Sequence, residues 1–265
     1  MRDSRFVRYF GHQKKQGVGV FSAVINLPRN FYAYYSRGKG PGSMIQGYLR
    51  YDLPLLASYS RSGTNWIRYT LEYISQRPTP GQVRLYYGSN YVIDRAHQAY
   101  PVMDKYQNVV LIIRNYRECL LRNLEEVWQS NPNTVAFLEN IEVFQQPGWY
   151  IKNIEAFDQF QGSKMLLYYE DLMTESDSSI RKLAGFIGLD KDRTEDYIAN
   201  IETRKAESVE AYKRRGHESQ TAGKQTNYHT KDKLTDEQAR EFDEYYRSHY
   251  PELFEKYLKR YELPA

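Results

Sequence analysis

The residues best suited to binding an anion lie in one short segment, Ser58-Tyr-Ser-Arg-Ser-Gly-Thr-Asn-Trp66. An apolar run precedes this segment and apolar residues at helical spacing follow it, which predicts a strand, a tight turn and a helix. Such a turn presents backbone N–H groups at the positive end of a helix dipole, where phosphate or sulfate binds well. Gly63 permits close backbone approach, and Arg61 adds a fixed positive charge. The alternative is an ordinary strand-to-helix turn.

Two arginines follow another apolar run at positions that suit the same anion. Arg114 comes directly after residues 108–113, and open α/β sheets bind ligands at the carboxyl ends of their strands. Arg122 lies off the apolar stripe of the following helix, so its side chain could reach the same edge. The alternative is that these arginines are solvated surface charges, and for Arg117 we prefer that interpretation.

A histidine and a tyrosine complete the set of candidate site residues. His97 closes the segment Asp94-Arg95-Ala96-His97, which follows a short apolar pair. A lone histidine is more often a hydrogen-bonded structural residue, but its pKa near neutrality also suits proton transfer. Tyr169 lies in Tyr168-Tyr-Glu-Asp-Leu172, at the end of a further apolar run.

Hydrophobic periodicity predicts the elements that position these residues. Three short apolar runs are typical of parallel strands covered on both faces: 53–59, 108–113 and 164–169. Each run is followed by apolar residues at helical spacing, at 66–74, 120–128 and 180–187. Strands that alternate with helices predict an α/β fold with a central parallel sheet between two layers of helices.

We interpret the 265 residues as a single domain, 1–265, since this length suits one large α/β core. Its expected parts are an irregular N-terminal segment, a core, a long charged loop and C-terminal helices, at 1–50, 51–190, 203–233 and 234–265. A capping box, Thr235-Asp-Glu-Gln238, predicts where the first C-terminal helix begins.

Composition limits the classes of function. With 37 basic and 33 acidic residues the net charge is +4, too weak a field for a nucleic-acid partner. The single cysteine, Cys119, excludes an internal disulfide and favours a reducing compartment. The sequence has no apolar run long enough to span a membrane and no signal-peptide pattern, so we expect a soluble, cytoplasmic protein without a membrane partner. Tyrosine outnumbers phenylalanine 26 to 11, which predicts a core edged with hydroxyls.

Four motifs resemble those of sulfotransferases that use 3′-phosphoadenosine 5′-phosphosulfate (PAPS). Residues 59–66, Y-S-R-S-G-T-N-W, are similar to the family loop Y-P-K-S-G-T-T-W, and residues 114–122 are similar to R-N-P-x-D-x-x-x-S. Arg95-Ala96-His97 is similar to K-T-H, and the family's Y-E-D-L stands intact at 169–172. Because all four motifs occur in the family's order within residues 53–190, the resemblance is specific. It implies a three-layer sandwich of the P-loop-like sulfotransferase type, with 51–190 as the nucleotide-binding core.

The resemblance also implies which residues bind the cofactor. Arg114 would bind the 3′-phosphate, Tyr169 would line the nucleotide site, and Trp66 would stack on the adenine. The 5′-phosphosulfate would be held by the loop, through Arg61, Ser62, Gly63, Thr64 and Asn65.

Catalytic roles follow from the same resemblance. His97 would be the general base that takes the proton from an acceptor hydroxyl, Arg61 would stabilise the leaving phosphate oxygen, and Arg95 would assist at the sulfuryl group. We expect no metal, because sulfate carries less charge than a terminal phosphate and fixed cations can suffice.

Three departures from the family pattern affect these roles. Arg61 stands where the family has lysine, which favours electrostatic stabilisation over acid catalysis because a guanidinium does not give up its proton. Arg122 stands where the family has serine: either it is a cofactor-binding residue that makes a stronger contact with the anion, or the pocket is rebuilt at this position. The family's later R-K-G segment is best matched by Arg214-Arg215-Gly216, with Arg215 and Gly216 as candidate ligands of the 3′-phosphate, while 222–224 competes for the same alignment.

The acceptor is the part of the function that the sequence leaves open, together with the oligomeric state. Our expectation is a hydroxyl of a small molecule or glycan, bound among the variable segments 1–50, 78–106 and 203–233. The tyrosines at 86, 87, 91 and 100 could stack on an acceptor, although filling the core is the preferred interpretation.

Two other functions remain as alternatives. One is a catalytically inactive protein that binds PAPS or adenosine 3′,5′-bisphosphate. The other is a kinase-like phosphotransferase, which is disfavoured because the G-x-x-x-x-G-K-[ST] spacing is absent.

Overall fold

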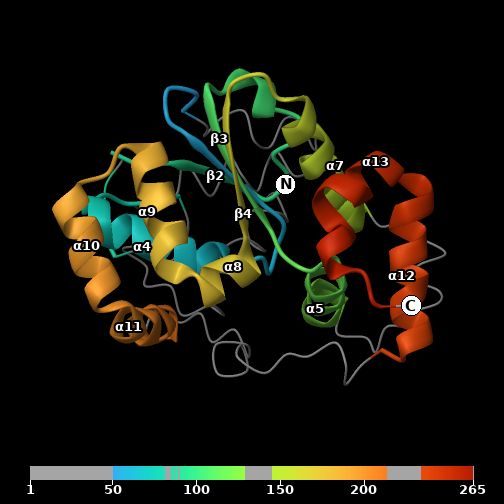
Figure 1. Cartoon of the computed structure of the whole chain (residues 1–265). Helices are drawn as coiled ribbons and strands as arrows, with labels where there is room; N and C mark the ends of the chain where they lie inside the picture. Colours follow the sequence, from blue (N-terminus) through green and yellow to red (C-terminus); the bar gives the residue numbers. More distant parts are fainter. Residues whose placement is uncertain are drawn as a thin grey trace, which may run out of the picture.

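A parallel sheet lies at the centre of the molecule (Figure 1). The computed structural model describes residues 50–80, 85–86, 88, 90–128, 145–213 and 234–264. Within these residues the sheet has four strands in the order β2-β1-β3-β4, namely β1 Leu55–Ser58, β2 Asp94–Ala96, β3 Asn108–Ile113 and β4 Ser163–Tyr168. Leu55 of β1 is in register with Asp94 on one side and with Val109 on the other. Because all pairings are parallel, the candidate site residues that follow the strands meet at one edge of the sheet.

The three predicted strands are confirmed, and the fourth was missed. β1, β3 and β4 fall on the predicted apolar runs with small shifts at their ends. β2 has only three residues and begins with Asp94, so it carries no apolar run that could reveal it. The Asp94 carboxylate is buried in the sheet, where it accepts hydrogen bonds from the Tyr106 hydroxyl and the Arg50 backbone N–H. Burial raises the pKa of Asp94 to about 6.

Helices cover both faces of the sheet (Figure 1), which confirms the expected α/β sandwich. On one face lie α4 Thr64–Ser75, α9 Ser176–Ile187 and α10 Lys191–Ala199, and on the other lie α5 Tyr116–Trp128, α7 Gln145–Gln159 and α12 Asp236–His249. β1 shows how the core divides, because Leu55 and Ala57 pack in the cluster with α5, α7 and α12, whereas Leu56 packs with α4.

The core beneath α5, α7 and α12 is rich in tyrosine, in line with the composition. Tyr116, Tyr150 and Tyr246 are buried there and contact one another edge-on or tilted. Arg117 is also in this core with only 4 % of its surface exposed, so the prediction that it is a solvated surface charge was wrong. The reason lies in α12, whose buried Asp243 forms an ion pair with Arg117 and accepts a hydrogen bond from the Tyr116 hydroxyl.

The expected long loop 203–233 begins as a helix instead, because α11 spans Ile201–Lys213. The helix has little apolar periodicity to reveal it, and its surface carries ion pairs at i,i+3 spacing. Residues 214–233 lie outside the described residues. The short helix α8, Tyr169–Thr174, connects β4 to α9.

The predicted C-terminal helices are confirmed. α12 begins with the predicted capping box, in which Thr235 and Gln238 exchange both hydrogen bonds. A second helical segment follows, composed of α13 Pro251–Leu253, a π-helical turn Phe254–Leu258 and a 3₁₀ turn Lys259–Tyr261. Residues 1–49, which hold most of the expected irregular segment, lie outside the described residues. Among the helices that are described, none combines the length and the apolar character needed to cross a membrane.

Candidate functional site

The loop between β1 and α4 has a left-handed backbone at two positions. Arg61 has φ 70° and Gly63 has φ 82°. A Cβ at Gly63 would lie 2.3 Å from Cδ2 of Tyr169, so the ring of Tyr169 packs directly on the glycine. α4 begins without a side-chain cap and without an acidic residue in its first turn, which leaves its positive end unneutralised.

Two hydroxyls of the loop are turned into the protein. Thr64 Oγ1 lies 2.8 Å from Ser58 Oγ, and Ser62 Oγ lies 3.5 Å from the sulfur of Cys119. Ser62 and Thr64 are buried, whereas Asn65 is exposed at the start of α4. These hydroxyls therefore tie the loop to β1 and α5.

Arg114 joins three elements at the end of β3. Its Nε and Nη2 donate to Glu118 Oε2 at 3.0 and 2.6 Å, and its Nη1 donates to the carbonyl of Arg61 at 3.1 Å. The guanidinium carbon lies 4.2 Å from the ring centroid of Tyr169. The side chain thus holds the loop, α5 and α8 together, and the end of its guanidinium fork keeps N–H groups that none of these contacts uses.

Two arginines, Arg61 and Arg122, lie close together at the loop between β1 and α4. Arg122 is buried, on α5. Loss of water on burial, together with the nearby positive charge of Arg122, lowers the pKa of Arg61 to about 10. A guanidinium with this pKa remains charged at neutral pH, so the two arginines form a region where an anion would be favoured.

His97 follows β2 and lies beside the end of β1. Its Nδ1 is 2.9 Å from the carbonyl oxygen of Ser58, which can only accept, so Nδ1 carries the proton and Nε2 has the free lone pair. Burial lowers the pKa of His97 to about 3, and the positive charges of Arg95, Arg68 and Arg61 add to this effect. The imidazole is therefore neutral at pH 7, which is the form a general base requires.

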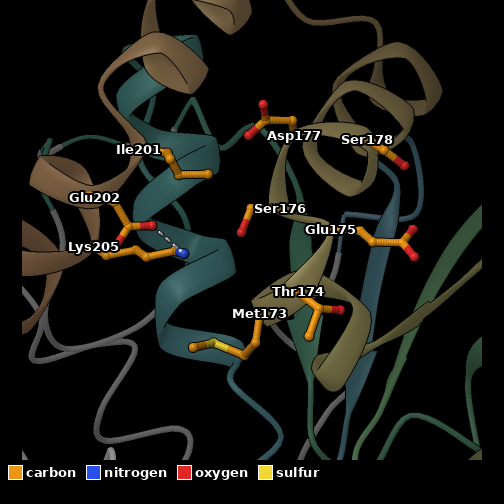
Figure 2. Close-up of a pocket in the computed structure, with 9 residues that line it drawn as sticks. All are labelled: Met173, Thr174, Glu175, Ser176, Asp177, Ser178, Ile201, Glu202 and Lys205. Atoms are coloured by element: carbon orange, nitrogen blue, oxygen red, sulfur yellow. Dashed lines mark hydrogen bonds and ion pairs between the residues drawn. The ribbon is translucent and has the colours of Figure 1, made fainter.

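A cavity with Lys205 in its lining lies near Trp66 of α4. The cavity has a volume of about 410 Å³ and is lined by residues 173–178, Ile201, Glu202 and Lys205 (Figure 2). Lys205 joins the two features, because its Nζ pairs with Glu202 at 2.7 Å and lies 5.4 Å from the ring centroid of Trp66.

Comparison with known proteins gives the family. The sulfotransferase domain family matches residues 89–257, which is more than half of the chain. The chain belongs to the sulfotransferase family. No curated protein sequence matches it.

A solved structure supports the fold of this sulfotransferase. The crystal structure of mouse sulfotransferase SULT7A1 complexed with PAP has a TM-score of 0.59 and 19 % identity, and the match covers 83 % of this chain and 91 % of that one. At this identity the likeness extends to the fold, a central parallel sheet flanked by helices.

The structure of this sulfotransferase brings most of the predicted site residues to the carboxyl edge of the sheet. Arg61, Arg114 and Tyr169 are in contact, and His97 touches the residue that precedes the loop. Arg215 and Gly216 lie outside the described residues. Within those residues, no group of three or more His, Cys, Asp or Glu side chains could hold a metal ion.

Two carboxylates at the site were missed by the sequence reasoning. Glu118 holds Arg114 by an i,i+4 ion pair, and this spacing in the sequence is the signal that could have revealed it. Glu170 accepts hydrogen bonds from the backbone N–H of Asn115 at 3.1 Å and from the Tyr261 hydroxyl at 2.7 Å. No local pattern links Glu170 to a tyrosine 91 residues away.

Proposed function

We propose that this sulfotransferase uses PAPS and transfers the sulfuryl group to a hydroxyl of a small molecule or glycan. The observation that carries this proposal is the pairing of His97 with the carbonyl of Ser58, the residue before the cationic loop. This contact puts a neutral imidazole next to the place that is best suited to the 5′-phosphosulfate. We further propose that residues 1–265 form one domain, in which residues 1–50, 78–106 and 203–233 contribute to the acceptor site.

The loop and its arginines would hold the anionic ends of the cofactor. Arg61, with the uncapped start of α4, would bind the 5′-phosphosulfate. The free end of the Arg114 fork would bind the 3′-phosphate, with its other side held by Glu118. Arg122 would add a second positive charge at the loop, and Arg215 and Gly216 would complete the 3′-phosphate site.

The adenine would bind beside Trp66. The cavity between 173–178 and α11 supplies a space of suitable size, and its rim carries Lys205, which already lies over the indole ring. Tyr169, at the start of α8, would line the nucleotide between this cavity and Arg114.

The reaction would be an in-line displacement at sulfur. The acceptor oxygen forms a bond to sulfur while the bond between sulfur and the bridging phosphate oxygen breaks, and the hydroxyl proton goes to Nε2 of His97. Arg61 would stabilise the negative charge on the leaving oxygen, and Arg95 would assist at the sulfuryl group. The products are a sulfate ester and adenosine 3′,5′-bisphosphate. Positioning and fixed charge provide the catalysis, as in phosphoryl transfer.

The charge of the cofactor would also activate the base. The pKa of free His97, about 3, is too low for efficient proton transfer at pH 7. Three of the groups that lower this pKa are positively charged arginines, and an anionic cofactor beside Arg61 would offset their effect. We therefore expect the pKa of His97 to rise when PAPS binds.

Two measurements test the proposed function. Transfer of ³⁵S from labelled PAPS to a panel of phenols, alcohols and sugars supports it, and a complete absence of transfer with retained binding of adenosine 3′,5′-bisphosphate favours the inactive binding protein. Thermal stabilisation is the second measurement. Stabilisation by ATP with Mg²⁺, but not by adenosine 3′,5′-bisphosphate, would favour a phosphotransferase and reject the proposal.

A further inference from the structure

Asn153, on α7, connects this helix to the turn that carries His97. Only 1 % of its surface is exposed. Its Oδ1 accepts hydrogen bonds from the backbone N–H groups of Ala99 and Tyr100 at 2.9 and 3.0 Å, and its Nδ2 donates to the carbonyl of His97 at 2.8 Å. All three bonds go to the backbone of residues 97–100, and they use three of the four hydrogen-bonding positions of the carboxamide.

The position of Asn153 in α7 is one that an apolar residue would normally occupy. Tyr150, Ile154 and Phe157 lie on the same face of the helix at i−3, i+1 and i+4, and all are buried in the core. A buried carboxamide is costly unless its groups are hydrogen-bonded. The presence of asparagine here is therefore explained by the turn that it binds, and not by the packing of α7.

His97 is consequently held at two points that are far apart in the sequence. The carbonyl of Ser58 accepts from Nδ1 of the ring, and the carboxamide of Asn153 donates to the backbone carbonyl of the same residue. The first contact sets the tautomer and the second sets the place of the main chain. The direction of Nε2 depends on both contacts, because a shift of the backbone would move Nδ1 away from the Ser58 carbonyl.

We propose that Asn153 is a positioning residue for the base: it fixes the backbone of His97 so that the ring stays on Ser58 and Nε2 stays directed at the acceptor. This inference rests on the proposed role of His97 and extends it to a residue that touches no reacting atom. Geometry of this kind matters for rate, since a misplacement of about 1 Å can lower the rate about 100-fold.

The test compares Asn153→Leu, which keeps the volume and removes all three hydrogen bonds, with Thr194→Val. Thr194 is buried in α10, where its hydroxyl donates to the carbonyl of Asp190, so this control also loses a buried hydrogen bond. ¹⁵N-histidine NMR reports the tautomer of His97, with its signal assigned through His97→Gln. We expect the Nδ1–H tautomer in the wild type and in Thr194→Val, and a shift toward the Nε2–H tautomer in Asn153→Leu.

Kinetic constants complete the test. With ³⁵S-PAPS and the best phenol of the panel, kcat of Asn153→Leu should fall about 10- to 100-fold, whereas its affinity for adenosine 3′,5′-bisphosphate should match that of the wild type. Asn153→Asp is the second variant, chosen in case Asn153→Leu does not fold. It keeps an acceptor for Ala99 and Tyr100 but loses the donor to His97, and we expect the same shift of tautomer.

The proposal is overturned if the tautomer and kcat of a folded Asn153 variant equal those of Thr194→Val. It is also overturned if the wild type has the Nε2–H tautomer. Failure of the wild type to bind adenosine 3′,5′-bisphosphate is a different result. It would reject the proposed function, while the tautomer comparison would still decide whether Asn153 positions His97.

Discussion

The two ends of the candidate site are held by different kinds of interaction. At the Arg114 end the charged groups are already paired. The Arg114 guanidinium forms an ion pair with Glu118 and donates a hydrogen bond to the Arg61 carbonyl, and the ring of Tyr169 stacks on it. At the His97 end the contacts are neutral hydrogen bonds: Nδ1 of His97 donates to the Ser58 carbonyl, and Asn153 donates to the His97 carbonyl. The charges that lower the pKa of the imidazole are arginines.

A bound anion would therefore act differently on the two ends. At the Arg114 end the cofactor would add to a framework that is already electrostatically satisfied, so binding there depends on geometry. At the His97 end the cofactor would change the electrostatics, because its negative charge offsets Arg61 and raises the pKa of the base. In the proposed function, cofactor recognition and activation of the base would thus belong to opposite ends of the same sheet edge.

The largest expected effect is at the His97 end. His97→Ala should lower kcat for sulfuryl transfer about 100- to 10,000-fold, since general-base catalysis contributes about this much. Its affinity for adenosine 3′,5′-bisphosphate should stay close to the wild-type value, because the ring is assigned no contact with the nucleotide. The measurement is ³⁵S transfer together with calorimetric binding. Full activity of His97→Ala at pH 7 would show that the proposed base is wrong.

Arg114→Ala should mainly weaken the binding of the nucleotide, whereas His97→Ala should mainly lower kcat. Loss of a buried charge pair costs about 2–5 kcal/mol, so the affinity for adenosine 3′,5′-bisphosphate should fall at least about 30-fold. The affinity for adenosine 5′-phosphate, which lacks the 3′-phosphate, should change much less. Calorimetry with both nucleotides checks the difference, and equal losses for the two would remove Arg114 from the 3′-phosphate site.

Gly63→Ala tests the loop between the two ends. The new Cβ would lie 2.3 Å from the Tyr169 ring at a backbone with φ 82°, so either the ring or the loop must move. Strain of this kind costs about 1–3 kcal/mol, and we expect both a lower Tm and a weaker affinity for adenosine 3′,5′-bisphosphate. Gly188→Ala is the matched control, because Gly188 has φ 78° and a Cβ there meets nothing within 4 Å, so this variant has the backbone strain without the clash.

Stability should depend on pH through His97. Its folded pKa of about 3 lies below the unfolded value, so between pH 3 and 6.5 the unfolded state binds more protons and the fold loses stability as the pH falls. The slope can reach about 1.4 kcal/mol per pH unit. Asp94, with its pKa raised to about 6, gives a slope of the opposite sign in the same range.

The contribution of His97 is therefore obtained by comparison with a variant. Thermal unfolding of the wild type and of His97→Gln should be followed from pH 4 to pH 7. We expect the stability difference between them to shift in favour of His97→Gln as the pH falls. A difference that does not vary with pH would contradict the low pKa of His97.

The smallest expected effect comes from the hydrogen bond between Tyr261 and Glu170, which stabilises the backbone next to Arg114. Tyr261→Phe removes the hydroxyl that donates to Glu170, which also holds the backbone after Arg114. A hydrogen bond to a charged group contributes about 1.5–3 kcal/mol, but only part of this loss would reach Arg114 through Glu170. The affinity for adenosine 3′,5′-bisphosphate should therefore fall only about 2- to 10-fold. Tyr257→Phe is the control, because its hydroxyl donates to Asp158, which belongs to α7 and lies outside the site. An equal effect of both variants would mean that Glu170 does not transmit the change.

Much of this arrangement could be predicted from local sequence. Apolar runs typical of strands precede Arg61, Arg114 and Tyr169. Because parallel strands end on the same side, these runs predict that the three residues lie at one sheet edge. The capping box at Thr235 is equally local. Each of these features depends on residues that are close together in the chain.

The features that were missed depend on distant partners or on weak periodicity. Arg117 is buried because of Asp243, which lies 126 residues later and which no local pattern pairs with it. The sequence of α11 predicts a loop because it is charged and polar with little apolar periodicity, whereas the structure has a helix there. Asn153 has a signal in the sequence, because it is a polar residue within the apolar stripe of a helix. Only the fold shows that its partner is the backbone of His97.

The contact between Gly63 and Tyr169 restricts how this chain could evolve. A larger residue at position 63 would displace the Tyr169 ring or the loop, and a smaller residue at position 169 would remove the ring that stacks on Arg114. Each substitution alone would disturb the same contact, so we expect their effects on stability to be non-additive. The tolerance of position 63 to substitution is therefore coupled, through Tyr169, to the partners of Arg114.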